Sequence, residues 1–145
     1  MKNHGGFTLV ELVTVVILIG VLSLALFSRL SVISSAAVQG SRDDLIAALS
    51  FAQQTAMMRS DISVVITGNS VSVNENSIPI KVSSNFYPLE MPKGVGLSTD
   101  VTDNTFIYDK LGRSNAGIIT ITGSGNSAGV SAKINVDVSG YAFTK

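Results

Sequence analysis

The chain has 145 residues, the length of a single domain, and 46% of them are hydrophobic. Ten basic residues balance ten acidic residues, which argues against a broad nucleic-acid-binding surface. Because the chain has no cysteine and a single histidine, disulfides, thiolate catalysis and cysteine-based metal sites are excluded, and we expect no metal site.

The apolar residues gather near the N-terminus. A short polar leader, residues 1–6, carries Lys2 and is followed by an uncharged run over residues 12–28. As a helix this run spans roughly 26 Å, and residues 7–10 extend it to a bilayer crossing that only Glu11 interrupts. Since Arg29 then supplies an interfacial charge, we predict a membrane-spanning helix over residues 7–29.

From residue 30 the pattern becomes amphipathic and predicts a helix to about Arg59. Four apolar residues recur on one helical face: Leu45, Leu49, Ala52 and Ala56. Ser41 with Asp44 predicts a local restart of the helix after Gly40. We therefore expect one long helix over about residues 7–59, with weak points near Gly20, Ser28 and Gly40.

Beyond residue 60 the apolar period is that of strands. Residues 62–67 and 70–74 flank Gly68-Asn69, which predicts a hairpin. Further strands are predicted at 78–82, 86–90, 105–108, 117–122 and 132–138, with a loose hairpin tip at 123–129. A helix followed by strands indicates an α+β fold class. Met57, Met58 and Tyr141 are predicted to be at least partly buried.

Glu11 is the most informative residue of the apolar segment. A carboxylate costs about 2.5–3.5 kcal/mol at the centre of a membrane helix and less near its end, so a functional role is the default hypothesis. If the leader is cut after Gly6, Phe7 supplies a terminal ammonium that Glu11 of a neighbouring subunit can pair with. The N-terminus of a helix also favours this negative charge.

The stretch MKNHGG-FTLVELVTVVILIGVLSLAL resembles the class III signal peptide of type IV pilins and type II secretion pseudopilins. The resemblance implies cleavage between Gly6 and Phe7, and N-methylation of Phe7, by a prepilin peptidase. It also implies an assembly salt bridge made by Glu11. The chain departs from the family at Ser28, where a proline is common. The alternatives are an ordinary secretory signal peptide cut near residues 34–36 and a plain single-pass anchor, which the position of Glu11 disfavours.

A weaker resemblance covers residues 44–65, 106–119 and 134–141, which are similar to the pseudopilin H and FimT type of minor pilin. Among these, the minor pilins of mannose-sensitive haemagglutinin (MSHA) pilus systems are the most similar. The resemblance implies a long N-terminal helix packed on an antiparallel β-sheet domain. The usual closing glycine–arginine pair is replaced here by Gly140-Tyr141.

The resemblance also implies an organisation and a set of partners. It gives a leader (1–6), a transmembrane and polymerisation helix (7–29) and a periplasmic domain (30–145). The subunit is then expected as a single-pass protein of the bacterial inner membrane and as part of a filament. Its partners are a prepilin peptidase, other major and minor pilin subunits, the inner-membrane assembly platform and the inner membrane. No cofactor and no nucleic acid are expected.

Two other functions stay open, and catalysis has no support. One is a pseudopilin at the tip of a type II secretion pseudopilus. The other is a filament-tip module that binds DNA or a surface ligand through basic residues: Lys81, Lys93, Lys110, Arg113, Lys133 and Lys145. The chain lacks the hydrolase, P-loop, zinc-protease and dinucleotide motifs, and its acidic residues are scattered, so no catalytic residue is predicted and the chain is not expected to be an enzyme.

Overall fold

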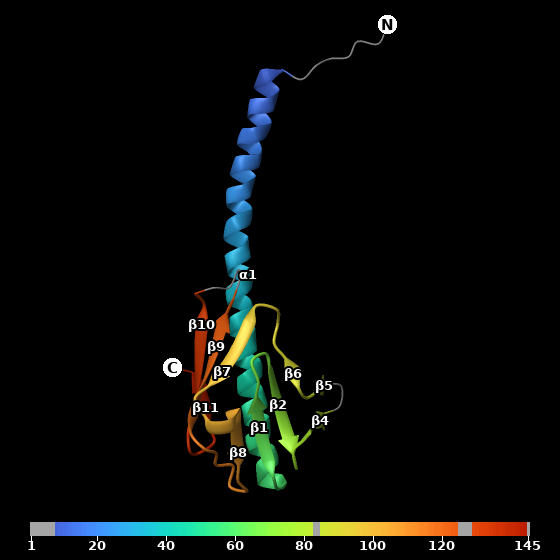
Figure 1. Ribbon diagram of the computed structural model, residues 1–145, viewed down its shortest axis with the longest axis vertical. Coiled ribbons are helices and arrows are strands. Elements are labelled where there is room, and N and C mark those ends of the chain that lie inside the picture. The colour runs from blue at the N-terminus through green and yellow to red at the C-terminus, as the bar shows by residue number, and fades with distance from the viewer. Residues whose placement is uncertain (1–7, 83–84, 125–128, 145) are drawn as a thin grey trace. The chain divides into compact units, whose positions relative to one another are not determined.

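The computed structural model describes residues 8–82, 85–124 and 129–144 (Figure 1). For residues 24–34, 82, 85 and 86 it describes the backbone alone. The chain divides into two compact units, Met1–Ile33 and Ser34–Lys145, and each is described by itself.

Helix α1 covers Leu9–Met58 and supplies part of both units. It is assigned as a continuous helix through Gly20, Ser28 and Gly40, so the predicted weak points do not interrupt it. The predicted restart at Ser41 is wrong. Ser41 is only 1% exposed, and it faces the core from the middle of the helix rather than capping a new one.

In the unit 34–145, one face of α1 forms half of the core. The predicted face is confirmed, since Leu45, Leu49, Ala52 and Ala56 are buried. The sheets contribute the other half: Ile62, Val64, Val71, Val73, Phe106, Ile119, Ile121 and Ile134. Burying each large apolar side chain contributes about 1.5–3 kcal/mol.

The first sheet contains strands β1 to β3, β6 and β8, all in antiparallel pairs. Its order is β3-β2-β1-β8, and β6 also pairs with β2. The strands are β1 Ile62–Ile66, β2 Ser70–Glu75, β3 Ile78–Pro79, β6 Leu89–Glu90 and β8 Thr105–Tyr108. The predicted hairpin at Gly68-Asn69 is confirmed, because the Thr67 N–H donates to the carbonyl of Ser70 at 2.8 Å.

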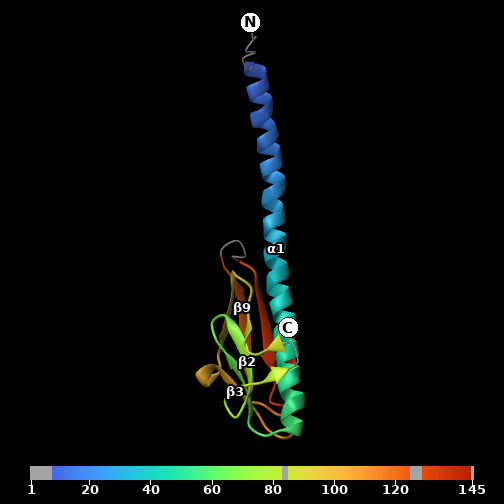
Figure 2. The ribbon, with the colours of Figure 1, turned by 90° about the vertical axis from the view of Figure 1, so that its right-hand side faces the viewer.

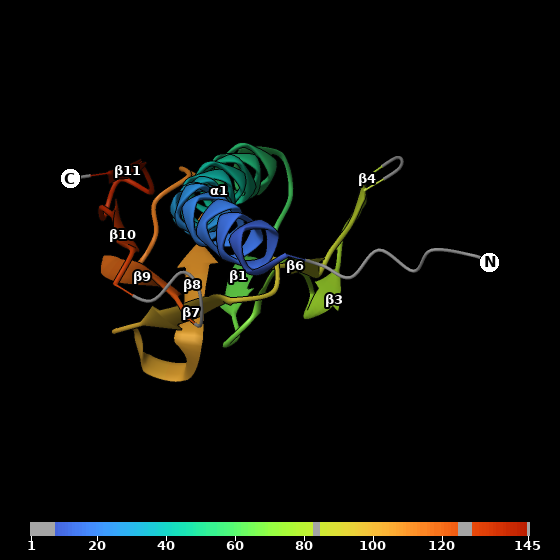
Figure 3. The ribbon, with the colours of Figure 1, turned by 90° about the horizontal axis from the view of Figure 1, so that it is seen from above.

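The second sheet has the order β11-β10-β9-β7, again antiparallel. Its strands are β7 Val95–Thr99, β9 Gly117–Gly123, β10 Ser131–Val136 and β11 Ala142–Thr144. The described residues also form a two-stranded ribbon, β4 Lys81–Val82 with β5 Asn85–Phe86, and a short 3-10 helix, η1 Thr102–Asn104, that precedes β8. Within 34–145, both sheets lie along one side of the helix (Figure 2), with β10 and β11 on one flank and β3 and β4 on the other (Figure 3).

Two strand predictions are wrong, and two strands were not predicted. Residues 78–82 form β3 and β4, which belong to different sheets, and residues 86–90 are divided by Tyr87-Pro88 between β5 and β6. Proline has no N–H for a strand ladder, which explains why the second run cannot form one strand. Strands β7 and β11 were missed because they depend on pairing with β9 and β10. Residues 125–128 of the predicted hairpin tip lie outside the described residues.

Candidate assembly site

The first described residue, Thr8, caps the start of α1. Its hydroxyl oxygen accepts the N–H of Glu11 at 3.3 Å, and its carbonyl accepts the N–H groups of Glu11 and Leu12 at 3.1 and 3.2 Å. A threonine in this position satisfies backbone donors that the first helical turn leaves open. The sequence reasoning missed this role, although Thr8 followed three residues later by Glu11 is the pattern of a capping box.

Glu11 lies in the first turn of α1 and is exposed. The positive end of the helix dipole favours a carboxylate here. Among the described residues, no cation lies within ion-pair distance of Glu11. The predicted cleavage and methylation residues, Gly6 and Phe7, lie outside the described part of the chain, so the pairing of Glu11 with a terminal amine stays a prediction.

The hydroxyl groups of this helical segment are paired within the helix. Thr14 donates to the carbonyls of Val10 and Glu11 at 3.0 and 2.9 Å, and Ser23 donates to the carbonyl of Ile19 at 2.7 Å. These bonds remove the need for water at both side chains. Over residues 8–23, Glu11 is therefore the ionisable group that an apolar environment leaves without a partner.

The apolar side chains of the same segment are open on every side of the helix. Their exposed fractions range from 42% at Val15 to 79% at Leu9. The others are Val10, Leu12, Val13, Val16, Ile17, Leu18, Ile19, Val21 and Leu22. A helix that is apolar all round requires an apolar environment, which one copy of this segment does not supply.

Among the residues that the structure describes, no helical stretch has both the length and the apolarity that a membrane crossing requires.

In the unit 34–145, two turns of the same design meet beside the end of α1. In each, an aspartate carbonyl accepts the N–H of a glycine three residues later: Asp109 from Gly112 at 2.9 Å, and Asp137 from Gly140 at 2.8 Å. Both glycines have positive φ, 75° and 80°. Each aspartate N–H then donates to the residue after the glycine, closing a hairpin turn.

The two aspartates also order their turns through their side chains. The Asp109 carboxylate accepts the N–H of Leu111 and of Arg113, both at 2.9 Å, and pairs with the Arg113 guanidinium at 2.8 Å. These contacts, led by the Arg113 N–H, lower the pKa of Asp109. The hydroxyl of Ser139 donates to Asp137 and likewise lowers the pKa of that carboxyl.

Gln53 joins the two turns to the helix. Its amide nitrogen donates to the carbonyl of Gly112 at 3.2 Å and to that of Ser139 at 3.0 Å. The turns touch each other so closely that a Cβ atom on Gly140 would overlap the Gly112 carbonyl oxygen. Gly112-Arg113 therefore forms a hairpin corner, and its arginine is paired with Asp109.

Large apolar side chains surround this junction and are exposed. Met57, Leu111, Val138 and Tyr141 are 54%, 68%, 59% and 64% exposed, and Met58 reaches 78%. The predicted burial of Met57, Met58 and Tyr141 is wrong, because the core face of α1 ends at Ala56 and Tyr141 points away from the side of β11 that buries Ala142. Tyr141 instead stacks on Phe143, with ring centroids 6.1 Å apart.

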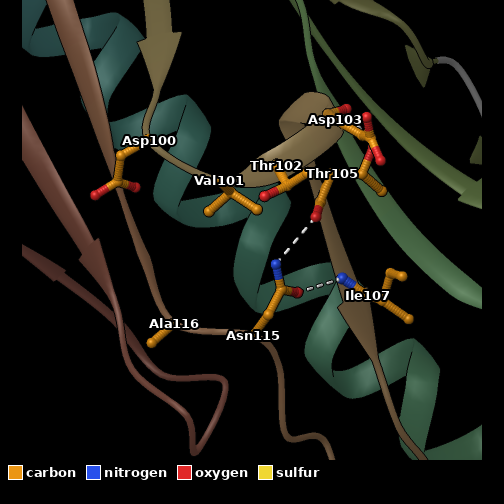
Figure 4. A pocket seen from close by; sticks show the side chains of 8 residues that line it. All are labelled: Asp100, Val101, Thr102, Asp103, Thr105, Ile107, Asn115 and Ala116. Atoms are coloured by element: carbon orange, nitrogen blue, oxygen red, sulfur yellow. Dashed lines mark hydrogen bonds between the residues drawn. The ribbon is translucent and has the colours of Figure 1, made fainter.

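The remaining candidates give no compact site. An open cavity of about 560 Å³ lies between β8 and the start of β9, lined by residues that include Asp100, Ile107 and Asn115 (Figure 4). The described basic residues of the alternative DNA-binding tip lie on different elements, Lys81 on β4 and Lys133 on β10 for example. Within the described residues no three His, Cys, Asp or Glu side chains are grouped as metal ligands.

Comparison with known proteins gives a match at the N-terminus and matches to the fold. Residues 1–27 match the family described as the prokaryotic N-terminal methylation motif. The fold is similar to that of the minor pseudopilin EpsH from the type 2 secretion system of Vibrio cholerae, with a TM-score of 0.60, 9% sequence identity, and coverage of 74% of this chain and 95% of that chain. No curated protein matches the sequence.

The fold is also similar to that of the type IV minor pilin FimU from Pseudomonas aeruginosa. One crystal form gives a TM-score of 0.58 at 15% identity, covering 74% of this chain and 87% of that chain. A second crystal form gives 0.53 at 15% identity, with 74% and 91% covered.

These findings confirm the predicted fold class, a helix packed on antiparallel sheets in a pilin-like α+β arrangement. A methylation motif of this kind implies processing by a peptidase and assembly with other pilins, and it suggests membrane anchoring. The chain thus combines a prepilin-type methylation motif with a pilin-like fold, and the solved structures similar to it are pilin and pseudopilin subunits.

Proposed function

We propose that this chain is a minor pilin subunit whose function is to enter, or to initiate, a type IV pilus filament. The observation that carries the proposal is the methylation motif over residues 1–27, which precedes a fold similar to minor pilins and pseudopilins. The motif supports processing of the chain as a prepilin, and the fold supports its assembly as a pilin-like subunit. An enzyme or a plain membrane anchor requires neither feature.

In this proposal, a prepilin peptidase cleaves between Gly6 and Phe7 and methylates the new N-terminus. Residues 7–29 then hold the subunit in the inner membrane, with residues 30–145 in the periplasm, until the assembly platform moves it into the filament. Both surroundings are apolar, so the hydrophobic effect favours neither strongly, and helix packing and ion pairing give the transfer its direction. The exposed apolar side chains of residues 9–22 support this role, as does the carboxylate of Glu11, which has no ion-pair partner among the described residues.

The finer assignment we propose is the MSHA-pilus minor pilin MshC, because residues 44–65 and 106–119 resemble that type. A pseudopilin at the tip of a type II secretion pseudopilus is the second candidate, and the similarity to EpsH favours it. Filaments sheared from the cell surface distinguish the two. We expect the chain to co-purify with surface pili, whereas a pseudopilin is expected to be absent from them and to be required for secretion.

The leader offers a matched pair of substitutions, since Gly5 and Gly6 are adjacent. We expect Gly6→Leu to accumulate as an uncleaved precursor, because the residue before the scissile bond has to be small, and Gly5→Leu to be processed. Mass spectrometry of the mature protein is expected to show methylated Phe7 as the first residue. Normal processing and assembly of Gly6→Leu would show that the proposed function is wrong.

A further inference from the structure

Strand β8 forms an edge of the first sheet. One side of it pairs with β1, in the register Val64↔Phe106, and the other side faces the open cavity of Figure 4. The outward side chain of Ile107 is 65% exposed. An edge strand with free N–H and carbonyl groups and an exposed apolar side chain is a template on which another chain can add a strand.

The side chain of Asn115 occupies the free backbone groups of this edge. Its amide oxygen accepts the N–H of Ile107 at 2.8 Å, and its amide nitrogen donates to the carbonyl of Thr105 at 3.1 Å (Figure 4). A neighbouring strand would use its own backbone N–H and carbonyl to pair with these groups. One side chain therefore supplies the donor and the acceptor that a strand would supply.

The chain around Asn115 explains why a side chain takes this place. Ser114 forms an isolated bridge with Tyr108 and so brings Asn115 alongside β8. The backbone then leaves for the second sheet at Gly117, where a Cβ atom would overlap the side chain of Val101. Because the chain cannot continue along β8, its own backbone provides no strand for the rest of this edge.

The opposite rim of the cavity is closed in the same way. The carboxylate of Asp100 accepts the N–H of Ile118, the second residue of β9, at 2.7 Å. Polar side chains thus pair with backbone groups on both sides of the cavity that separates β8 from β9. At Asn115 a single side chain satisfies both a donor and an acceptor, whereas at Asp100 the carboxylate and the backbone N–H share these two roles.

We propose that Asn115 stands in for a neighbouring strand along β8 and thereby prevents this edge from pairing with β8 of a second copy of the chain. Residues 105–108 are short, uncharged and rich in strand-forming side chains, so two copies can align them antiparallel once the edge is free. This protection does not depend on the proposed function, because it concerns the folded unit 34–145 alone.

The test compares full-length variants in the same detergent, by light scattering after size-exclusion chromatography. We expect Asn115→Ala to raise the fraction of dimers and larger species about fivefold over the original chain. Thr102→Ala is the matched control, since Thr102 lines the same cavity without bonding to β8, and it is expected to change nothing. If Asn115→Ala associates no more than Thr102→Ala does, the proposal is wrong.

A second substitution shows which surface associates. Ile107→Lys places a charge on the exposed side chain of the edge, and charged residues discourage strand addition. We expect Asn115→Ala/Ile107→Lys to return to the original size distribution. Association that persists in the double variant comes from another surface and also overturns the proposal.

Asn115→Asp separates the two hydrogen bonds. It keeps an acceptor for the Ile107 N–H and removes the donor to the Thr105 carbonyl. We expect the fraction of dimers and larger species of Asn115→Asp to lie between the fractions of the original chain and of Asn115→Ala. At a dilution where Asn115→Ala is monomeric, hydrogen exchange at the Ile107 amide is expected to rise about fivefold in Asn115→Ala and to change little in Asn115→Asp. An exchange rate that is equal in all three chains would contradict the edge-pairing role.

Discussion

Gln53 gives the most direct test of how the two aspartate–glycine turns are held. Substitution by alanine removes hydrogen bonds of 3.2 and 3.0 Å to the carbonyls of Gly112 and Ser139. Each such bond contributes about 0.5–1.5 kcal/mol net. Because the bond to Ser139 is exposed and that to Gly112 is only part-buried, we expect the lower half of the sum, about 1.5 kcal/mol. For a unit of this size that lowers Tm by roughly 6 °C.

The measurement is thermal unfolding of the full chain in detergent, followed by near-ultraviolet circular dichroism. Gln54→Ala is the matched control, because Gln54 is the adjacent exposed residue, and we expect it to stay within about 0.5 kcal/mol. Gln53→Glu is expected to destabilise more than Gln53→Ala, because it places a negative charge against two carbonyl oxygens. Equal melting of Gln53→Ala and Gln54→Ala, or a milder effect of Gln53→Glu, would refute the reasoning.

Three further predictions concern titration and assembly. The pKa values of Asp109 and Asp137 are lowered, so both carboxylates stabilise the fold above the ordinary aspartate pKa, and this stabilisation is lost as pH falls through the folded pKa values. Between about pH 5 and pH 2, the urea midpoint of Asp109→Asn should therefore decline less than that of the original chain. Burial raises the pKa of Tyr108 to about 12, so this tyrosine stabilises the fold below about pH 10, and that stabilisation is lost as pH rises further. An absorbance titration of the tyrosines should show an ionisation step near pH 12 that Tyr108→Phe removes. Glu11→Gln should leave processing intact yet reduce incorporation into sheared filaments at least about tenfold, the effect of about 1.4 kcal/mol, whereas normal incorporation would exclude a role for the charge.

The sequence predicted those parts of the fold that follow from local period and turn chemistry. The buried face of α1, including Leu45 and Leu49, was read from a 3.6-residue repeat, and the β1–β2 hairpin from Gly68-Asn69. The N-terminal motif could be recognised without any periodicity, since its residues are contiguous in the chain. Each of these features is determined within a window of a few turns or one hairpin.

The features that were missed depend on residues distant in the chain. Gln53 contacts Ser139, 86 residues away, and nothing in the helical pattern marks it apart from Gln54. The position of Asn115 on β8 depends on where Gly117 crosses to the second sheet. Thr8 is the exception, because its capping pattern with Glu11 is local and was available from the sequence.

The two units leave their polar groups in different states, and this difference bears on assembly. In 34–145, side chains such as Gln53, Asn115 and Asp109 pair with backbone groups that turns and strand edges leave open. In residues 8–23 the hydroxyls are paired within their own helix, while the carboxylate of Glu11 and a continuous apolar surface have no partner among the described residues. Substitutions in the unit 34–145 are therefore expected to change mainly its stability or its pairing with other copies, whereas substitutions at Glu11 are expected to change which partner the helix binds.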